Sequence, residues 1–285
     1  MFSIETFKSG ALIAGTFAAA AFALEAQAAV VPQSALISSS SYYTDDIGGN
    51  IVTTGGDNAA NVGLSSGRND DGFMALNLGF SVSFFGNTYT SLYINNNGNV
   101  SFNNGIADYI PNGPTGAAAP IISVFFGDVD TRASASGVVH YRKDADQLIV
   151  TWDRVGYFFD GVARADKLNS FQLVLRGDNY LIPAGEGAIG FFYKNMGWGE
   201  TRDSDLEPLS AAAIGFGDGA GNSEVLEGSN TTGLFAAVSN KHVWFDPNLA
   251  PVSPVANAVP EPGLFGLMGL GLAGLAIGRR RTAVN

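Results

Sequence analysis

The stretch Leu78–Phe102 decides the fold and reads LGFSVSFFGNTYTSLYINNNGNVSF. Phe80, Val82 and Phe84 alternate with small polar residues, the period of two that is typical of a strand with one buried face. Asn95–Gly98 interrupts this pattern before it resumes. Asn-Gly favours the two positive φ angles of a type I′ turn, so the stretch predicts a tight antiparallel hairpin.

Further short strands follow this hairpin along the chain. Apolar and polar residues alternate in several short runs, whereas no long run inside the domain repeats its apolar residues every 3.6 positions. The 37 glycines and 11 prolines among 285 residues supply turns between the strands. The pattern predicts a mainly β fold, an antiparallel β-sandwich-like domain. Its predicted strands include Ile122–Phe126, Val138–Tyr141, Leu148–Trp152, Phe171–Leu175, Ala188–Tyr193 and Ala212–Phe216.

Several short motifs follow one another at a distinctive spacing between Leu78 and Phe245. They are Phe84-Phe85-Gly86, Tyr89, Leu92-Tyr93-Ile94 with Asn97-Gly98, Ile122–Arg132 with its Asp-Val-Asp-Thr-Arg sequence, Gly137–Arg142, Leu148–Trp152, Phe171–Leu175 and Ala213–Gly219. Their order resembles that of nidogen-like (NIDO) extracellular domains. The span is that of one domain.

The composition excludes several classes of protein. With a net charge of −11 and no basic stripe, the chain repels a phosphate backbone, so we expect no nucleic-acid partner. The chain has no cysteine, which excludes disulfides, thiolate metal sites and a cysteine nucleophile. Since exported animal domains of the nidogen-like kind usually carry disulfides, this chain is predicted to be a bacterial version whose core is held together by burial alone.

Residues 1–28 have the pattern of a secretory signal peptide. The apolar, alanine-rich run Ala11–Leu24 is followed by Ala26-Gln27-Ala28, which fits the small-x-small rule for cleavage. We therefore expect a signal-peptide helix, recognition of Ala26 and Ala28, and a mature chain that begins at Ala29. A retained membrane anchor is the alternative interpretation.

The C-terminal end contains a second targeting pattern. A Pro-rich linker at 246–259 precedes Pro260-Glu261-Pro262, the apolar run Leu264–Gly278 and Arg279-Arg280-Arg281. This order resembles the PEP-CTERM sorting signal of exported bacterial proteins. As a helix the apolar run spans ~22 Å against about 30 Å of hydrocarbon, so flanking residues must complete a short transmembrane helix. The three arginines are predicted to act as a cytoplasmic stop.

These patterns divide the chain into five parts. They are the signal peptide at 1–28, the N-terminal part of the β domain at 29–77, the nidogen-like domain at 78–245, the linker at 246–259 and the sorting tail at 260–285. The sorting resemblance implies that an exosortase-type protease recognises Pro260, Glu261 and Pro262. The protein is therefore expected to be exported, and to be anchored in the cell envelope by its C-terminal helix or extracellular after processing.

Two acids and an arginine lie close together after Gly127. In an extended strand Asp128, Asp130 and Arg132 would share one face, and the strand is predicted to leave the core at Gly127. We expect Arg132 to form a structural ion pair with Asp130 or with an acid on a neighbouring strand. No metal or cofactor is assigned, although Asp128 and Asp130 are candidate ligands of an alternative cation site. The turn Asn69–Gly72 is a separate stretch whose carboxylates could attract calcium.

No catalytic residue is predicted. The two histidines, His140 and His242, fall in strand-like segments, and no Gly-x-Ser-x-Gly motif accompanies them, which argues against a hydrolytic triad. Asp203 and Asp205, like the two acids after Gly127, could suggest a glycosidase. Such acids normally come from different strands around a deep cleft, so we expect that the protein is not an enzyme.

Nidogen-like domains are associated with adhesion to extracellular matrix. The resemblance therefore implies an interaction module at the cell surface or in a biofilm matrix, with matrix or surface polymers as partners. The alternative is a secreted carbohydrate-binding or carbohydrate-cleaving protein.

Overall fold

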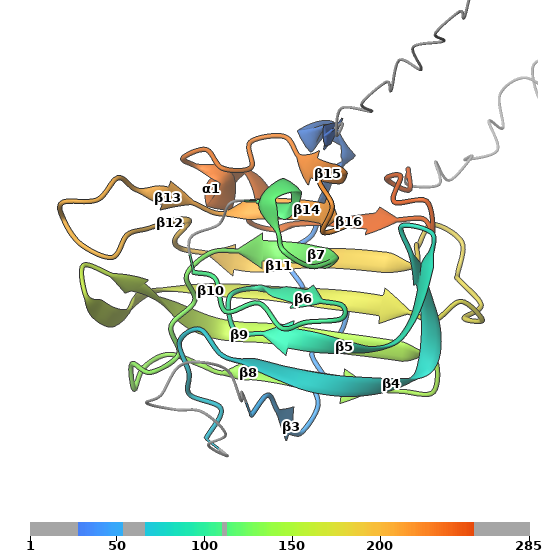
Figure 1. Cartoon of the computed structure of the whole chain (residues 1–285), viewed down its shortest axis with the longest axis horizontal. Helices are drawn as coiled ribbons and strands as arrows, with labels where there is room; N and C mark the ends of the chain where they lie inside the picture. The colour runs from blue at the N-terminus through green and yellow to red at the C-terminus, as the bar shows by residue number, and fades with distance from the viewer. Residues whose placement is uncertain (1–27, 54–65, 110–112, 254–285) are drawn as a thin grey trace, which may run out of the picture.

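The computed structural model describes residues 28–53, 66–109 and 113–253, which form two β-sheets packed face to face (Figure 1). The first sheet has seven strands in the order β1-β15-β14-β7-β6-β5-β4. Its strands are β1 (Ala28–Val31), β4 (Phe73–Phe84), β5 (Asn87–Asn95), β6 (Asn99–Ser101), β7 (Ile121–Phe126), β14 (Ala213–Gly217) and β15 (Ser223–Leu226).

The second sheet also has seven strands, in the order β2-β16-β11-β10-β9-β8-β3. They are β2 (Ile37–Ser38), β3 (Asn50–Ile51), β8 (Val139–Lys143), β9 (Gln147–Phe159), β10 (Val162–Arg176), β11 (Ile189–Met196) and β16 (Lys241–Phe245). The remaining elements are the pair β12 (Glu200–Thr201) and β13 (Ser210–Ala211), the helix α1 (Leu234–Val238) and the 3₁₀ turns η1 (Gln33–Ala35) and η2 (Pro114–Gly116).

The strand pairing confirms the predicted mainly β, antiparallel sandwich. Every pair of described strands is antiparallel except β1 with β15, which is parallel. Within the described ranges no helix has both the length and the apolar character needed to cross a membrane. The predicted signal-peptide helix and C-terminal helix fall at 1–27 and 254–285, outside the described residues.

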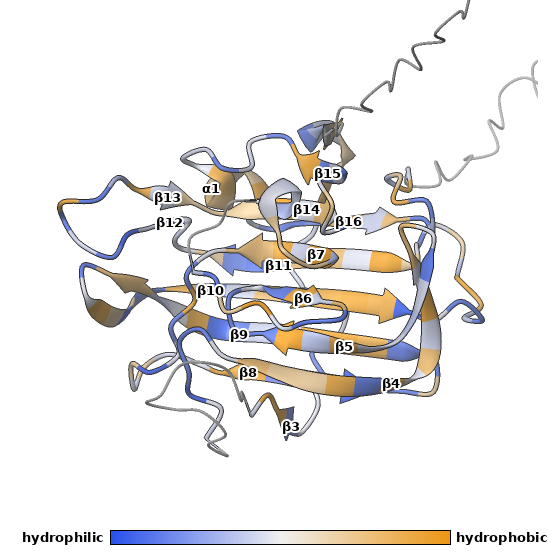
Figure 2. Ribbon diagram, viewed as in Figure 1, coloured by the Kyte–Doolittle hydropathy of each residue, from blue (hydrophilic) through white to orange (hydrophobic). Residues whose placement is uncertain are grey.

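One hydrophobic core lies between the sheets, because alternate side chains of each strand point inward. Figure 2 shows apolar residues recurring along the strands of both sheets. Aromatic rings meet across the layers: the centroids of Phe191 and Phe216 lie 5.4 Å apart, and those of Phe125 and Phe171 lie 5.6 Å apart. The hydroxyl of Tyr193 donates to the carbonyl of Val124 in the facing sheet at 2.8 Å. The predicted burial of alternate apolar residues therefore builds a sandwich core.

The predicted hairpin forms, but its turn differs from the prediction. Asn95 pairs with Asn99, and only Gly98 of the three residues between them has a positive φ, 76°. This is a three-residue connection with glycine in the left-handed position, so a type I′ turn at Asn97-Gly98 was the wrong prediction. Two consecutive positive φ angles occur instead at Phe85 (45°) and Gly86 (74°), between β4 and β5, and again at Asp160 (51°) and Gly161 (76°), between β9 and β10.

The N-terminal segment pairs with the last strands of both sheets. β1 pairs with β15, and β2 pairs with β16. Between β2 and β3 the chain crosses the outer face of the second sheet, where the ring of Tyr43 lies 5.6 Å from that of Trp244 and 5.7 Å from that of Phe192. Of the predicted cleavage residues, Ala28 and Ala29 lie in β1, whereas Ala26 lies outside the described residues.

The packed domain extends beyond the predicted start of the linker at residue 246. Pro251 forms a β-bridge with Phe245, and the amide of Val252 donates to the carbonyl of Trp244 at 2.8 Å. Leu249 is buried, and the carboxylate of Asp246 accepts hydrogen bonds from two backbone amides of the same turn. These contacts assign 246–252 to the folded domain, and residues from 254 onward are not described.

We predict that Gly98→Ala strongly destabilises the protein. A Cβ at this position would lie 1.9 Å from the carbonyl oxygen of Phe125, in addition to the strain of φ 76°. The expected loss in unfolding free energy is at least about 3 kcal/mol. Gly86→Ala is the matched control, because its φ is 74° but nothing lies within 4 Å of the added Cβ. Its loss should stay near 1 kcal/mol, and equal losses in chemical denaturation would contradict the prediction.

Candidate functional site

The chain passes from one sheet to the other between β7 and β8, through a buried irregular segment. β7 ends at Phe126, as predicted for a strand that leaves the core at Gly127. The residues that follow do not continue as a strand, so a single charged strand face was the wrong prediction. Asp128 is 3% exposed and Asp130 is fully buried. The charged side chains therefore lie inside the protein.

Backbone hydrogen bonds to several parts of the chain hold this crossing segment. The amide of Asp130 donates to the carbonyl of Gly156, and the amide of Phe158 donates to the carbonyl of Asp128. The amide of Val129 donates to Oδ1 of Asn97 at 3.0 Å. These partners come from separate parts of the chain and not from one neighbouring strand. The crossing segment therefore satisfies its backbone polar groups without belonging to either sheet.

Asn96 joins the crossing segment to the turn at Asn69–Gly72. Its side-chain NH2 group donates to the backbone carbonyls of Asn69, Asp70 and Val129, and the backbone carbonyl of Asn96 accepts from Nε1 of Trp152 at 2.9 Å. Asn96 is 1% exposed. The sequence predicted only a tight hairpin turn here. The signal for a buried contact was the run of three asparagines, whose side chains both donate and accept hydrogen bonds.

Arg132 and Asp130 form the structural ion pair expected from the sequence. Nε and Nη2 of Arg132 donate to the two carboxylate oxygens of Asp130, at 3.0 Å to Oδ1 and 2.7 Å to Oδ2. Nη2 of Arg132 also lies 2.5 Å from Oδ2 of Asp70. This bidentate geometry engages both oxygens of Asp130.

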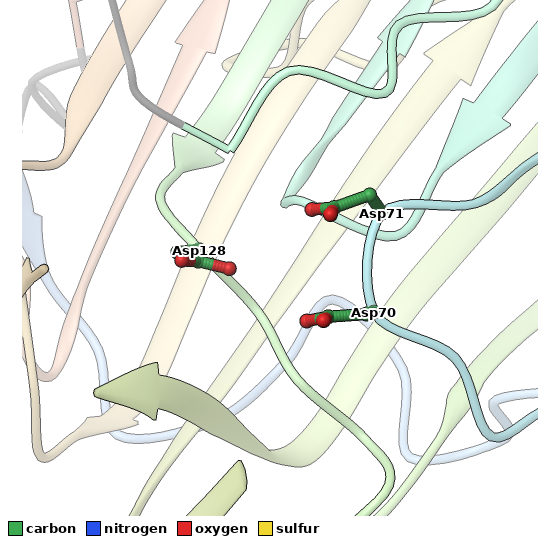
Figure 3. A group of neighbouring side chains, drawn as sticks. All are labelled: Asp70, Asp71 and Asp128. Atoms are coloured by element: carbon green, nitrogen blue, oxygen red, sulfur yellow. The ribbon is translucent and has the colours of Figure 1, made fainter. Parts of the chain in front are cut away.

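Three other carboxylates converge beside this pair: Asp70, Asp71 and Asp128 (Figure 3). One oxygen of each lies within 4.8 Å of the others. Asp71 accepts a hydrogen bond from Nδ2 of Asn97 at 2.9 Å, whereas no described residue donates to the carboxylate of Asp128. The group thus unites Asp128 with the Asn69–Gly72 turn and leaves out Asp130. An arrangement of this kind can share protons or bind a hard cation.

Burial and mutual repulsion raise the pKa values of the three carboxyls. Burial, with the charges of Asp130 and Asp71, raises the pKa of Asp70 to about 8, while Arg132 acts in the opposite direction. Burial raises the pKa of Asp71 to about 6. Burial and the nearby charge of Asp70 raise the pKa of Asp128 well above its usual range. Charged forms of these groups are therefore disfavoured as the protein stands.

The second predicted pair of acids lies in a different part of the fold from the Asp128 segment. Asp203 and Asp205 lie in the connection between β12 and β13, so they do not share a strand face. Asp203 lies near Tyr109, whose pKa it raises, and its charge also raises the pKa of Asp71.

The two histidines do lie in strands, as the sequence predicted. His140 is in β8 and His242 is in β16, with three strands of the second sheet between them, so they cannot meet in one site. The ring of His242 stacks on Phe192. Among the described residues, Nδ1 of each histidine is buried and has no hydrogen-bond partner.

A cavity of about 340 Å³ lies beside the β9–β10 hairpin. Tyr157 and Trp198 stack in its wall, with ring centroids 5.4 Å apart, and Phe159 adds a third aromatic surface. Polar groups are contributed by Lys167, Arg164 and Glu200. The sequence did not predict this cavity, because its lining residues come from four separate segments.

The sorting residues Pro260, Glu261 and Pro262 and the stop residues Arg279, Arg280 and Arg281 lie outside the described residues.

We predict that, in the presence of a chelator, the protein loses stability as the pH rises from about 5 to about 8. An acid whose pKa is raised by folding binds its proton more tightly in the folded state, so stability falls as the pH passes from the unfolded value towards the folded one. Asp130, Arg132 and Asp203 are further charged residues that face the three carboxyls and influence their pKa values. Thermal unfolding across this range measures the effect, and Asp128→Asn should flatten the slope. A melting temperature that rises with pH would contradict it.

Comparisons with known proteins place these observations in a family. The model of the NIDO-related family matches residues 42–251. Nidogen of Drosophila melanogaster is 30% identical to this chain, over 67% of the chain and 16% of that protein. Alpha-tectorin of Mus musculus is 28% identical and that of Homo sapiens 27%, each over 53% of the chain and 8% of the relative. The chain thus spans a small part of each relative's length, and no solved structure matches it.

The tail has a match of its own. The model of the PEP-CTERM protein-sorting motif matches residues 258–281, which include both the Pro-Glu-Pro sequence and the three arginines. This match supports an exported surface protein that is processed by sorting machinery of the exosortase type. The family match covers most of the chain and coincides with the sandwich. The chain belongs to the NIDO-related family.

Proposed function

We propose that the folded domain is an interaction module that binds matrix or surface polymers outside the cell. The observation that carries this proposal is the position of the two matches: the NIDO-related region at 42–251 takes in most of the sandwich, and the sorting motif follows at 258–281. A domain delivered in this way would meet the polymers of the cell surface. The proposal includes no catalytic step.

Sorting is the first step of this function. A signal peptide cleaved before Ala29 would bring the domain outside, and Leu264–Gly278 would hold the tail in the membrane with Arg279–Arg281 in the cytoplasm. An exosortase-type protease would then recognise Pro260-Glu261-Pro262 and release or transfer the domain.

A glycan is the polymer that the cavity beside the β9–β10 hairpin fits best. Sugar rings present flat apolar faces, which pack on aromatic side chains such as Phe159, and hydroxyls, which pair with charged and polar groups. Lys167 is exposed, and Glu200 is fixed by a hydrogen bond from the amide of Gly233 at 2.7 Å. This combination favours carbohydrate binding as the specific form of the interaction.

We predict that sorting removes the C-terminal tail. When the full chain is expressed in a host that has an exosortase-type protease, mass spectrometry should find a mature C-terminus before Leu264, whereas a host without it should yield chains that end at Asn285. Glu261→Ala should block the processing, and Glu207→Ala, an exposed acid in the domain, should leave it unchanged. A wild-type chain that still ends at Asn285 in the first host would refute the sorting step.

We also predict that Phe159→Ala weakens glycan binding. The mature protein should bind a subset of an array of neutral and acidic oligosaccharides saturably and without turnover. Loss of one aromatic contact should weaken binding by about fivefold or more. Phe158→Ala is the control, since Phe158 is equally half-buried but is adjacent in the same strand and so faces the other side. Turnover, no binding, or equal effects of the two variants would overturn the glycan assignment.

A further inference from the structure

We propose that Asp70, Asp71 and Asp128 bind one calcium ion where the chain crosses from one sheet to the other. This site does not depend on the interaction function proposed above, because its residues lie in the crossing segment and in the Asn69–Gly72 turn. The ion would join these two segments, which lie far apart in the sequence.

The distances suit a single ion. One oxygen from each of the three carboxylates lies within 4.8 Å of the other two. Calcium binds oxygens at about 2.3–2.6 Å, so ligands on opposite sides of one ion lie up to about 5 Å apart. Figure 3 shows the three side chains directed into the same space from two segments.

The state of Asp128 is the second observation that points to a ligand. This residue is 3% exposed, and its carboxylate accepts no hydrogen bond from any described residue. Arg132 does not supply the missing charge, because its guanidinium is engaged by Asp130 and Asp70. A buried carboxylate without a hydrogen bond or a positive partner is strongly unfavourable, and a bound cation removes that cost.

The donor set selects a hard cation and favours calcium. All three donors are carboxylate oxygens, the chain has no cysteine, and both histidines lie in strands of the second sheet. This excludes the thiolate and imidazole ligands that suit zinc and copper. The donors lie on irregular segments, which accommodate the flexible coordination of calcium better than the strict octahedron of magnesium.

Thermal unfolding of the mature protein, purified from cells that express the full chain and freed of metal with a chelator, tests the proposal. Calcium chloride should raise the melting temperature of the wild type by about 5 °C or more when free calcium is a hundredfold above Kd. Isothermal titration should give one site per chain, and magnesium chloride at the same concentration should produce a smaller rise. Asp128→Asn should abolish the calcium-dependent rise.

The controls separate a binding defect from a folding defect. In chelator, Asp128→Asn should melt at or above the wild-type temperature, because the substitution replaces an acid whose charged form is disfavoured by burial and by its neighbours with a neutral amide of the same size. Asp144→Asn, at the opposite end of β9 from the residues that contact Asp128, should keep the full rise with calcium. If Asp128→Asn does not fold, Asp71→Asn at a half-buried position should weaken calcium binding at least tenfold. No rise in the wild type, or an equal rise in Asp128→Asn, would overturn the site, and an equal rise with magnesium would overturn the choice of calcium.

Discussion

A chain that passes between two packed sheets must satisfy its backbone polar groups without the help of a neighbouring strand. In this protein the asparagines of the β5–β6 turn meet that constraint. Asn97 accepts from the amide of Val129, and Asn96 donates to the carbonyl of Val129 in the crossing segment and to that of Asp70 in the neighbouring turn. Gly98 is required for the same reason, because its missing side chain lets Phe125 approach the turn. The turn, the crossing segment and the facing sheet therefore depend on one another.

The same crossing places several acidic side chains close together inside the protein. Arg132 offsets part of it through its bidentate contact with Asp130, the kind of pairing that makes a buried carboxylate tolerable. The backbone on either side of the three remaining carboxylates is held by the asparagines, which keeps the segments that carry them close together. With calcium in the proposed position, the stability of the exported domain would follow the ion content of its surroundings.

The strands could be predicted from the sequence because apolar residues recur at every second position in Leu78–Phe102 and in the later runs. This pattern indicates a strand with one buried face. The turn type could not, since Asn-Gly has a local preference that the packing of Gly98 against Phe125 overrides. Asp128 was recognised as a candidate ligand, and Asn69–Gly72 separately as a candidate calcium turn. Their convergence depends on the sheet topology, which a local pattern does not contain. The burial of the asparagines was missed for the same reason.

The pairing of β1 with β15 and of β2 with β16 has a consequence for the order of folding. In a chain that is secreted from its N-terminus, the first strands to emerge must wait until almost the whole domain has followed, because their partners lie near its end. Contacts so distant in sequence form slowly. With secretion from the N-terminus, as proposed, this delay would hinder premature closure inside the cell and would keep the chain competent for translocation until its last strands have passed.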